Sequence, residues 1–135
     1  MSLNFVIGSR GSRLAIEQSN IVKNNILKKT SNIDVSIKII KTKGDILLSK
    51  SVQHLVDKGC FVNEIQKELI RNKINISVHS LKDLPTKNEE NISICSILKR
   101  ENPSDVFISR DNLNPYQMPN GSVIATSSNR RKYQL

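Results

Sequence analysis

The stretch Ile74-Asn-Ile-Ser-Val-His-Ser-Leu-Lys-Asp-Leu-Pro85 organises the interpretation of the whole chain. Its first half alternates apolar and polar residues, which is typical of a half-buried strand. Its second half gathers polar residues, and Pro85 disfavours helical backbone at the residue before it. We therefore expect these polar residues to lie in a turn at the carboxyl end of the strand. Ligands bind at such strand ends in open α/β sheets, so a functional interpretation begins at Lys82 and Asp83.

A less specific interpretation of Lys82 and Asp83 stands beside this one. A neighbouring Lys-Asp pair in a loop is also typical of a solvated surface pair, which contributes less than about 1 kcal/mol to stability. Charged groups mark functional sites only statistically. The choice between the two interpretations therefore depends on the rest of the chain.

The residues before this stretch predict an α/β domain. Residues 5–7 form a short apolar run and residues 33–39 alternate, so both are expected to be strands. A helix is expected from its N-cap at Ser12 to about Lys29, and a second helix after Gly59. Strand, helix, strand, helix, strand is the pattern of a parallel sheet with right-handed crossovers. Residues 46–58, which follow a turn signal at Gly44-Asp45, are polar and poorly patterned, and we expect them to be mobile.

Arg10 lies in the expected turn between the first strand and the first helix. It is either an ordinary surface arginine or an anion ligand assisted by the backbone N–H groups at the start of the helix. The turn is not a phosphate-binding loop of the common kind, because it lacks the Gly-Lys-Ser/Thr ending.

The residues after Pro85 predict a further strand, a linker and the beginning of another unit. Strands are expected at 92–97, 106–109 and 123–126, and Pro103 excludes a helix through 99–105. A helix is expected to open at Asn129, with Ser127 and Ser128 as candidate caps. We therefore expect a first domain at 1–98, a crossover linker at 99–105 and the start of a second domain at 106–135. Because the last helix has nothing to pack against, we expect the chain to be a portion of a longer protein.

The composition restricts the class of partner. The chain has 21 Lys and Arg against 12 Asp and Glu, a formal net charge of +9, so an anionic partner is expected: nucleic acid, acidic lipid or a small polycarboxylate. Only 4% of the residues are aromatic and there is no Trp, which leaves few stacking platforms for single-stranded nucleic acid. The lysines are scattered and do not form a basic stripe with interleaved aromatics, which disfavours nucleic acid as the partner.

The cysteines and the apolar runs indicate an ordinary cytoplasmic protein. Cys60 and Cys95 have no short metal-ligand spacing and there are only two histidines, so no metal site is expected. Both cysteines are interpreted as small buried apolar residues. The amino terminus lacks a basic region followed by a long apolar core, and no apolar run approaches the roughly 20 residues of a membrane span. We therefore expect a cytoplasmic location and no membrane partner.

Six stretches of the chain, in this order, resemble the porphobilinogen deaminase (hydroxymethylbilane synthase) family. They are Ile7-Gly-Ser-Arg-Gly-Ser-Arg-Leu-Ala-Ile-Glu-Gln18, Thr42-Lys-Gly-Asp45, Lys58-Gly-Cys-Phe-Val-Asn-Glu64, Val78-His-Ser-Leu-Lys-Asp-Leu-Pro-Thr86, Lys99-Arg-Glu-Asn-Pro-Ser-Asp105 and Ala125-Thr-Ser-Ser-Asn-Arg-Arg131. The short motifs are weak singly, but six in register around His-Ser-x-Lys-Asp-x-Pro are highly specific. The resemblance covers essentially the whole chain, and this chain covers less than half of the family's length.

The resemblance implies a fold and a reaction. The family has two α/β domains similar to periplasmic binding proteins, each a mixed sheet flanked by helices, which face each other across a cleft. The family also has a smaller third domain, which we expect to lie outside this chain. The family's enzyme condenses four porphobilinogen molecules with loss of ammonia to give hydroxymethylbilane, a precursor of porphyrins and haem. The product grows from a dipyrromethane cofactor, which is joined by a thioether to a cysteine of the third domain. The full-length protein is expected to be a monomer.

The resemblance also implies roles for matching residues, none of them metal ligands. Asp83 matches the catalytic carboxylate that holds pyrrole N–H groups. The residues matching cofactor-binding or cofactor-lining positions are Lys82, Ser80, Thr126, Ser127, Ser128, Arg130 and Arg131. Arg10 matches a residue that binds substrate carboxylates, and Arg100 lies in the crossover between domains and is assigned to substrate binding. His79 is expected to support the loop by hydrogen bonding and not to act as a base.

The implied chemistry agrees with these residue types. Loss of ammonia from an aminomethylpyrrole leaves a cationic, azafulvene-like species, which a fixed carboxylate stabilises. Every substrate ring carries two carboxylates, and forked guanidinium groups match carboxylates geometrically. An excess of basic residues therefore needs no nucleic acid to explain it.

Some positions depart from the family pattern. Cys60 stands where the family usually has leucine, Arg13 replaces a usual proline and Asn129 a usual leucine. Neither cysteine is at a cofactor-attachment position. We therefore expect the isolated chain to be inactive and to carry no dipyrromethane.

Two rival functions remain. One is a small-anion binding module of the same fold without catalysis. The other is a basic protein that binds nucleic acid through charge alone, for which weak, salt-sensitive binding would not be diagnostic.

Overall fold

The computed structural model describes residues 3–49, 59–86 and 90–134. The chain divides into two units, residues 1–95 and 96–135, and each is described below by itself. The first unit holds a small parallel sheet with helices, so the expected α/β class is confirmed at that level. The finer assignment of a periplasmic-binding-protein-like domain at 1–98 remains a prediction.

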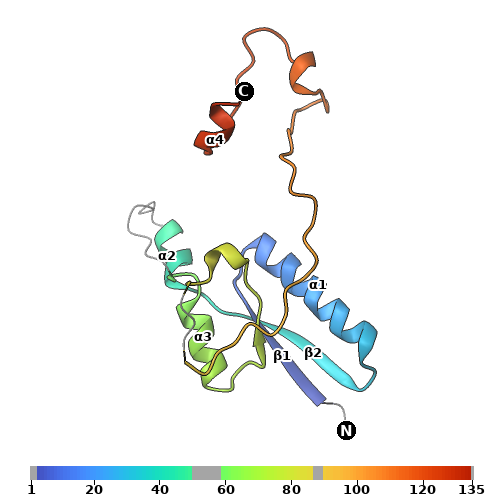
Figure 1. Cartoon of the computed structure of the whole chain (residues 1–135), viewed down its shortest axis with the longest axis vertical. Helices are drawn as coiled ribbons and strands as arrows, with labels where there is room; N and C mark the ends of the chain where they lie inside the picture. The colour runs from blue at the N-terminus through green and yellow to red at the C-terminus, as the bar shows by residue number, and fades with distance from the viewer. Residues whose placement is uncertain (1–2, 50–58, 87–89, 135) are drawn as a thin grey trace. The chain divides into compact units, whose positions relative to one another are not determined.

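The sheet of the first unit has three strands in the order β2-β1-β3, all parallel. The strands are β1 (Leu3–Ser9), β2 (Ile33–Ile39) and β3 (Ile76–Ser77). The central strand, β1, pairs with β2 along its whole length and with β3 at its carboxyl end, where Gly8 lies opposite Ser77. Figure 1 shows β1 and β2 side by side. The carboxyl ends of β1 and β3 therefore meet at one edge of the sheet.

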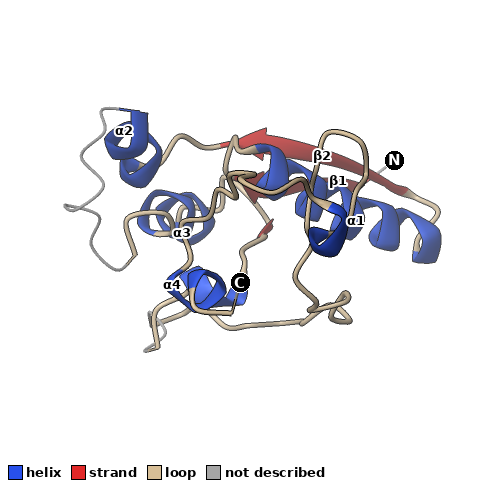
Figure 2. Cartoon of the chain, turned by 90° about the horizontal axis from the view of Figure 1, so that it is seen from above, coloured by secondary structure: helices blue, strands red, loops and turns tan. Residues whose placement is uncertain are grey.

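Three helices accompany the sheet in the first unit as described. They are α1 (Arg13–Lys29), α2 (Lys43–Ser49) and α3 (Asn63–Ile70). α1 packs against β1 and β2, and α3 packs against β1 and β3 (Figure 2). The predicted N-cap of α1 is confirmed, because Oγ of Ser12 accepts a hydrogen bond from the backbone N–H of Ala15 at 3.3 Å. The predicted ends of this helix are likewise correct.

The hydrophobic core lies between the sheet and α3. Ile40, Ile65 and Ile74 form a buried cluster, against which Val6 and Leu69 pack. β1 approaches this cluster closely at Gly8, where an added Cβ would lie 2.3 Å from Cδ1 of Ile74. A larger residue at position 8 would therefore require the Ile74 side chain to move.

Residues 46–49, for which the sequence predicts no regular pattern, belong to helix α2. The helix starts at a reciprocal cap: Oγ1 of Thr42 accepts from the N–H of Asp45 at 3.3 Å, while the Asp45 carboxylate accepts from the N–H of Thr42 at 3.2 Å. This is the arrangement of a capping box with aspartate in the third position. The remainder of that prediction, 50–58, lies outside the described residues.

The strand expected at the start of the 74–85 stretch is present but short. Only Ile76 and Ser77 form the ladder with β1. Further backbone bonds to β1 extend the pairing: the N–H of Asn75 donates to the carbonyl of Val6 at 2.8 Å, and that of Val78 to Gly8 at 3.1 Å. The side chain of Asn75 adds a bond, since its Oδ1 accepts from the N–H of Val6 at 2.7 Å.

The strands expected at 92–97, 106–109 and 123–126 are not formed among the described residues. Their apolar side chains are exposed, to 71% at Ile97, 88% at Ile108 and 92% at Val123. An alternating sequence forms a strand only when a neighbouring strand makes hydrogen bonds with its backbone N–H and C=O groups. No described segment pairs in this way with any of the three predicted strands. The expectation that both cysteines are buried is half right: Cys60 is buried and Cys95 is exposed.

The second unit contains two short helical segments, η3 (Pro115–Gln117) and α4 (Asn129–Lys132). The predicted start of a helix at Asn129 is confirmed. Its cap is Ser128, whose side chain accepts from the N–H of Arg131 at 3.4 Å. In the described parts of both units, no helix is long and apolar enough to cross a membrane.

Candidate functional site

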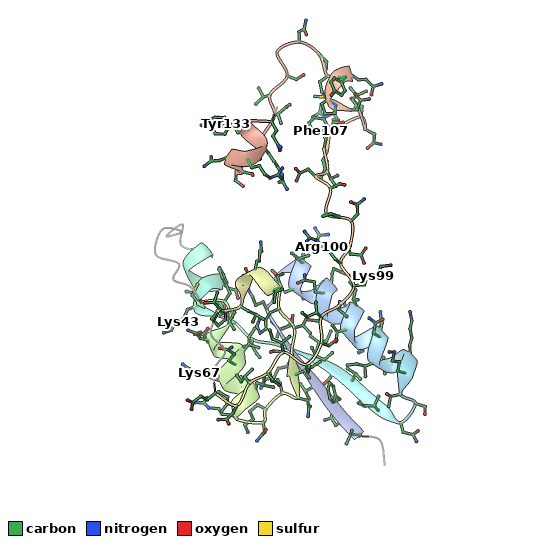
Figure 3. The ribbon with its side chains drawn as sticks, viewed as in Figure 1. Lys43, Lys67, Lys99, Arg100, Phe107 and Tyr133 are labelled. Carbon is green, nitrogen blue, oxygen red and sulfur yellow. The ribbon has the colours of Figure 1, made fainter. Side chains whose placement is uncertain are left out.

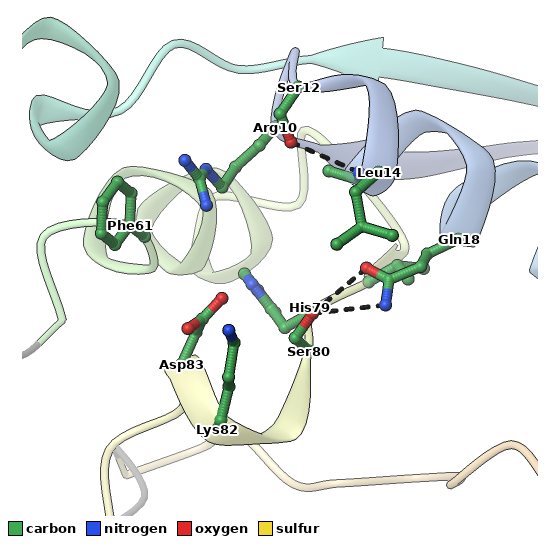
Figure 4. Close-up of a pocket in the computed structure, with 11 residues that line it drawn as sticks. Arg10, Ser12, Leu14, Gln18, Phe61, His79, Ser80, Lys82 and Asp83 are labelled. Carbon is green, nitrogen blue, oxygen red and sulfur yellow. Dashed lines mark hydrogen bonds between the residues drawn. The ribbon is translucent and has the colours of Figure 1, made fainter. Parts of the chain in front are cut away.

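A cavity of about 240 Å³ opens at the edge of the sheet where β1 and β3 end. Its wall is built from the turn after β1, the first turns of α1, the ring of Phe61 and the segment 78–83 (Figure 4). The structure thus brings four of the sequence-predicted residues into one pocket: Arg10, Ser80, Lys82 and Asp83. They converge because the carboxyl ends of adjacent parallel strands lie side by side.

The turn that carries Lys82 and Asp83 is one turn of 3₁₀ helix, η2 (Leu81–Asp83). The N–H of Asp83 donates to the carbonyl of Ser80 at 2.9 Å. The following residue, Leu84, has extended backbone (φ −74°, ψ 142°), as its position before Pro85 requires. The turn predicted from the proline is therefore confirmed, and it directs both charged side chains to the pocket (Figure 4).

A side-chain contact ties this turn to helix α1. Nε2 of Gln18 donates to Oγ of Ser80 at 3.2 Å, and that hydroxyl lies 3.3 Å from Oε1 of the same amide (Figure 4). Gln18 belongs to the amino-terminal motif, and the sequence pattern predicts no role for its side chain. This contact holds Ser80, the residue before η2, against the first turns of α1.

Arg10 is held on two sides. Its Nε and Nη2 groups both donate to Oδ1 of Asp45, at 3.1 and 2.5 Å. Its guanidinium carbon lies 4.0 Å from the centroid of the Phe61 ring, a cation–π arrangement. Both charged side chains are mostly buried, 18% exposed for Arg10 and 23% for Asp45. The arginine is therefore oriented before any ligand binds.

Asp45 is the fixed anion of this arrangement. Burial by itself raises the pKa of its carboxyl, but the hydrogen bonds from Arg10 and Thr42 outweigh burial and hold the pKa below the ordinary 3.8. Thr42 is fully buried and donates from Oγ1 at 2.7 Å. Asp45 and Phe61 contact Arg10, and the sequence pattern predicts neither contact. The Thr-x-x-Asp capping pattern was the available signal for Asp45.

His79 lines the same pocket. Its Nε2 is buried and has no hydrogen-bond partner among the described residues, and support of the loop by hydrogen bonding from His79 stays a prediction. Burial lowers the pKa of His79 below 6.5 and the charge of Arg10 lowers it further, against the opposing effect of the Asp83 carboxylate. The imidazole is therefore neutral at pH 7.

Arg130 and Arg131 share one carboxylate in the second unit. Nη2 of Arg130 lies 2.6 Å from Oδ2 of Asp105, and Nη2 of Arg131 lies 2.8 Å from Oδ1. These bonds, from Arg130 first and then Arg131, lower the pKa of Asp105. Two guanidinium groups on one carboxylate leave a net positive charge.

The partners described for the Asp105 carboxylate do not include the other predicted residues of the second unit, which are Thr126, Ser127, Ser128 and Arg100. The hydroxyl of Thr126 accepts from the N–H of Ser128 at 3.2 Å, which prepares the start of α4. Ser127 lies between them and Arg100 is exposed in an extended segment (Figure 3). Among residues 3–49, 59–86 and 90–134, no three His, Cys, Asp or Glu side chains are placed to hold a metal ion.

A family model and several known proteins match nearly the whole chain. Residues 5–135 match the model of a family described as porphobilinogen deaminase, dipyromethane cofactor binding domain. Curated porphobilinogen deaminases are similar over nearly the whole chain. That of Clostridioides difficile (strain 630) is 46% identical over 134 residues, which are 98% of this chain and 44% of the relative. That of Chloroherpeton thalassium is 41% identical over 135 residues, 100% of this chain and 43% of the relative. The chain thus spans less than half the length of these relatives.

Proposed function

The chain belongs to the porphobilinogen deaminase family, and we propose that it supplies the amino-terminal part of an enzyme that makes hydroxymethylbilane. In this proposal four porphobilinogen molecules are condensed with loss of ammonia. The observation that carries it is the pocket in which Asp83, Lys82 and Arg10 converge within a chain that matches the family from residue 5 onward.

Asp83 is proposed as the catalytic carboxylate. It lies at the end of η2 and lines the pocket, where it can accept hydrogen bonds from the pyrrole N–H of a bound ring. When ammonia leaves the aminomethyl group, positive charge develops on the ring system. A carboxylate fixed in advance stabilises that charge without reorganisation of the surroundings.

Arg10 is proposed to bind a substrate carboxylate while keeping its contact with Asp45. A guanidinium has five N–H donors, and the bonds from Nε and Nη2 to Asp45 use two of them. The remaining donors on a planar, oriented group suit a carboxylate. Asp45 therefore positions the arginine and limits the net charge of the empty pocket. Arg100 is assigned the same class of ligand, by resemblance alone.

The family's description names a dipyrromethane cofactor, and the donors of this chain fit a group rich in carboxylates. Lys82 faces the pocket and forms no ion pair among the described residues, so its charge is available. The residues proposed to hold the cofactor are Lys82, Ser80, Thr126, Ser127, Ser128, Arg130 and Arg131. When bound, the cofactor supplies the pyrrole end from which the product grows. Neither Cys60 nor Cys95 is proposed as its attachment point.

A small-anion binding module is the second candidate, because the same basic pocket could hold an anion without turning it over. The experiment is a fusion in which residues 1–135 replace the matching segment of the Clostridioides difficile relative. The proposal predicts that this protein gains the mass of a dipyrromethane and consumes porphobilinogen. A folded fusion that binds porphobilinogen and never consumes it would favour the binding module.

A further inference from the structure

Two buried side-chain atoms lack a hydrogen-bond partner in the part of the chain that the structure describes: Oγ of Ser19 and Nε2 of His79. Ser19 is fully buried within α1 and does not line the pocket. His79 does line the pocket, next to the turn that carries Asp83. An unpaired buried polar atom is unfavourable, and its presence at a site calls for a partner that arrives with the ligand.

The surroundings of His79 hold charges of both signs. Arg10 acts on it from the turn after β1, and Asp83 from η2, while Lys82 lies on the same turn. Figure 4 shows the imidazole between Arg10 and the Lys82–Asp83 turn. Asp45 pairs with Arg10, and both its oxygens are already engaged, by Arg10 and by Thr42. No side chain among these is bonded to Nε2 of His79.

We propose that His79 is a ligand-contacting residue of this pocket, whose Nε2 forms a hydrogen bond to a carboxylated pyrrole bound between Arg10 and Asp83. The proposal rests on the proposed function, because it takes porphobilinogen as the ligand. It differs from the role expected from the sequence, in which His79 only supports the loop.

The chemistry of an imidazole suits this place. Lys82 and Arg10 can only donate hydrogen bonds, and a carboxylate such as Asp83 can only accept them. A neutral imidazole carries one donor and one acceptor, so with Nε2 as the acceptor it can take a hydrogen bond from an N–H of the ligand, which Lys82 and Arg10 cannot do. Protonation would remove the acceptor and place a second positive charge beside Arg10. Binding through a neutral His79 should therefore weaken as the pH falls through its pKa.

The test uses the fusion with the Clostridioides difficile relative and three variants: His79→Leu, His79→Gln and the matched control Ser19→Ala. His79→Leu and Ser19→Ala each remove an unpaired buried polar atom, so both should keep or raise the Tm. Only His79→Leu should raise KM for porphobilinogen, by about tenfold, the typical effect of one hydrogen bond. His79→Gln retains a polar end and should fall between His79→Leu and the unmodified fusion.

A pH series separates contact from packing. In the unmodified fusion, kcat/KM should fall as the pH decreases below 6.5, and this decline should persist in Ser19→Ala and disappear in His79→Gln. An unchanged KM and an unchanged pH profile in a folded His79→Leu variant would overturn the proposal. A second result would also overturn the proposal: a lowered Tm in the His79→Leu variant, together with a normal Tm and a normal KM in the His79→Gln variant.

A measurement on the 135-residue chain distinguishes this failure from failure of the proposed function. Addition of porphobilinogen should shift the imidazole nitrogen resonances of His79, which are assigned by their absence in a His79→Gln variant. If the fusion is inactive but these resonances shift, the catalytic function is wrong and the contact stands. If the fusion is active and they do not shift, the contact is wrong.

Discussion

Oδ1 of Asp45 accepts two hydrogen bonds from Arg10, at 3.1 Å from Nε and 2.5 Å from Nη2. The second oxygen of Asp45 is engaged by Thr42, so the carboxylate has no freedom to rotate away. The ring of Phe61 lies against the guanidinium at 4.0 Å. A basic group of the pocket is therefore fixed by α2 and by the segment that precedes α3.

Replacing Asp45 by Asn should weaken the fold of the first unit. The variant keeps the shape of the side chain but loses charge-assisted bonds to a mostly buried guanidinium, a loss of about 1–3 kcal/mol in the free energy of unfolding. Urea unfolding measures it. Glu68→Gln is the matched control, because it removes a carboxylate from the 2.6 Å ion pair with the more exposed Lys38 and should change little. Equal effects of both variants would contradict the account of Asp45.

The same pair predicts how stability depends on pH. The pKa of Asp45 is lowered in the folded chain, so the unfolded chain binds more protons as the pH falls below the ordinary value of 3.8. Its contribution is present above that value and is lost as the pH falls toward the folded pKa. The lowered pKa of His79 acts in the same direction below 6.5. In the Asp45→Asn variant, the loss of folding stability below pH 3.8 should be smaller than in the unmodified chain. The loss of stability that begins as the pH falls below 6.5 should remain.

Gly44 should tolerate no Cβ while Phe61 is present. A Cβ at this position would lie 2.3 Å from Cδ1 and Cε1 of the Phe61 ring, so the ring must move. Gly44→Ala should destabilise by about 1–3 kcal/mol through overpacking, although alanine is normally the better residue in a helix. In a Phe61→Ala background the same change should be neutral or stabilising. A double-mutant cycle by urea unfolding checks this change of sign.

The carboxyl of Asp105 should titrate below its usual range, because Arg130 and then Arg131 donate hydrogen bonds to it. Arg130→Gln should raise its midpoint in an NMR titration more than Arg131→Gln does. Lys132→Gln is the matched control, since it removes the same charge from α4 and leaves both partners of Asp105 in place. Because the pairs are exposed, 1 M salt should weaken the difference. A midpoint insensitive to Arg130→Gln would contradict the described pairing.

Residues 1–135 alone are predicted to carry no covalent dipyrromethane and to consume no porphobilinogen. The resemblance places neither Cys60 nor Cys95 at an attachment position, and the chain spans less than half of its relatives. Intact mass and porphobilinogen loss are the measurements. An added mass of one dipyrromethane, or sustained turnover, would refute this prediction and direct attention first to Cys60.

The sequence predicts the elements that depend on local pattern. β1, α1 and β2 follow from apolar runs, periodicity and the cap at Ser12, and η2 follows from Pro85. The start of α2 was missed because it depends on the reciprocal bonds of Thr42 and Asp45 and on the fit of Phe61 over Gly44. The alternating residues after residue 90 predict strands that are not formed among the described residues. Alternation marks an apolar face, but it does not provide a neighbouring strand to pair with.

The sequence likewise predicts one part of the candidate site and does not predict another. Arg10 and Asp83 come together because they follow parallel neighbouring strands, which topology alone indicates. Asp45 and Phe61 contact Arg10 from other elements, and spacing along the chain does not reveal such contacts. The roles of the site residues, a cytoplasmic location and a monomeric full-length protein remain predictions.

Turnover of porphobilinogen by the fusion protein with Asp83→Asn tests the central claim most directly. The account predicts that this variant folds, gains the mass of the cofactor and consumes porphobilinogen about 10²–10³ times more slowly than the unmodified fusion, the usual effect of removing one preorganised electrostatic group. Turnover near that of the unmodified fusion, in a variant that is equally folded and equally loaded, would contradict the assignment of Asp83 as the catalytic carboxylate.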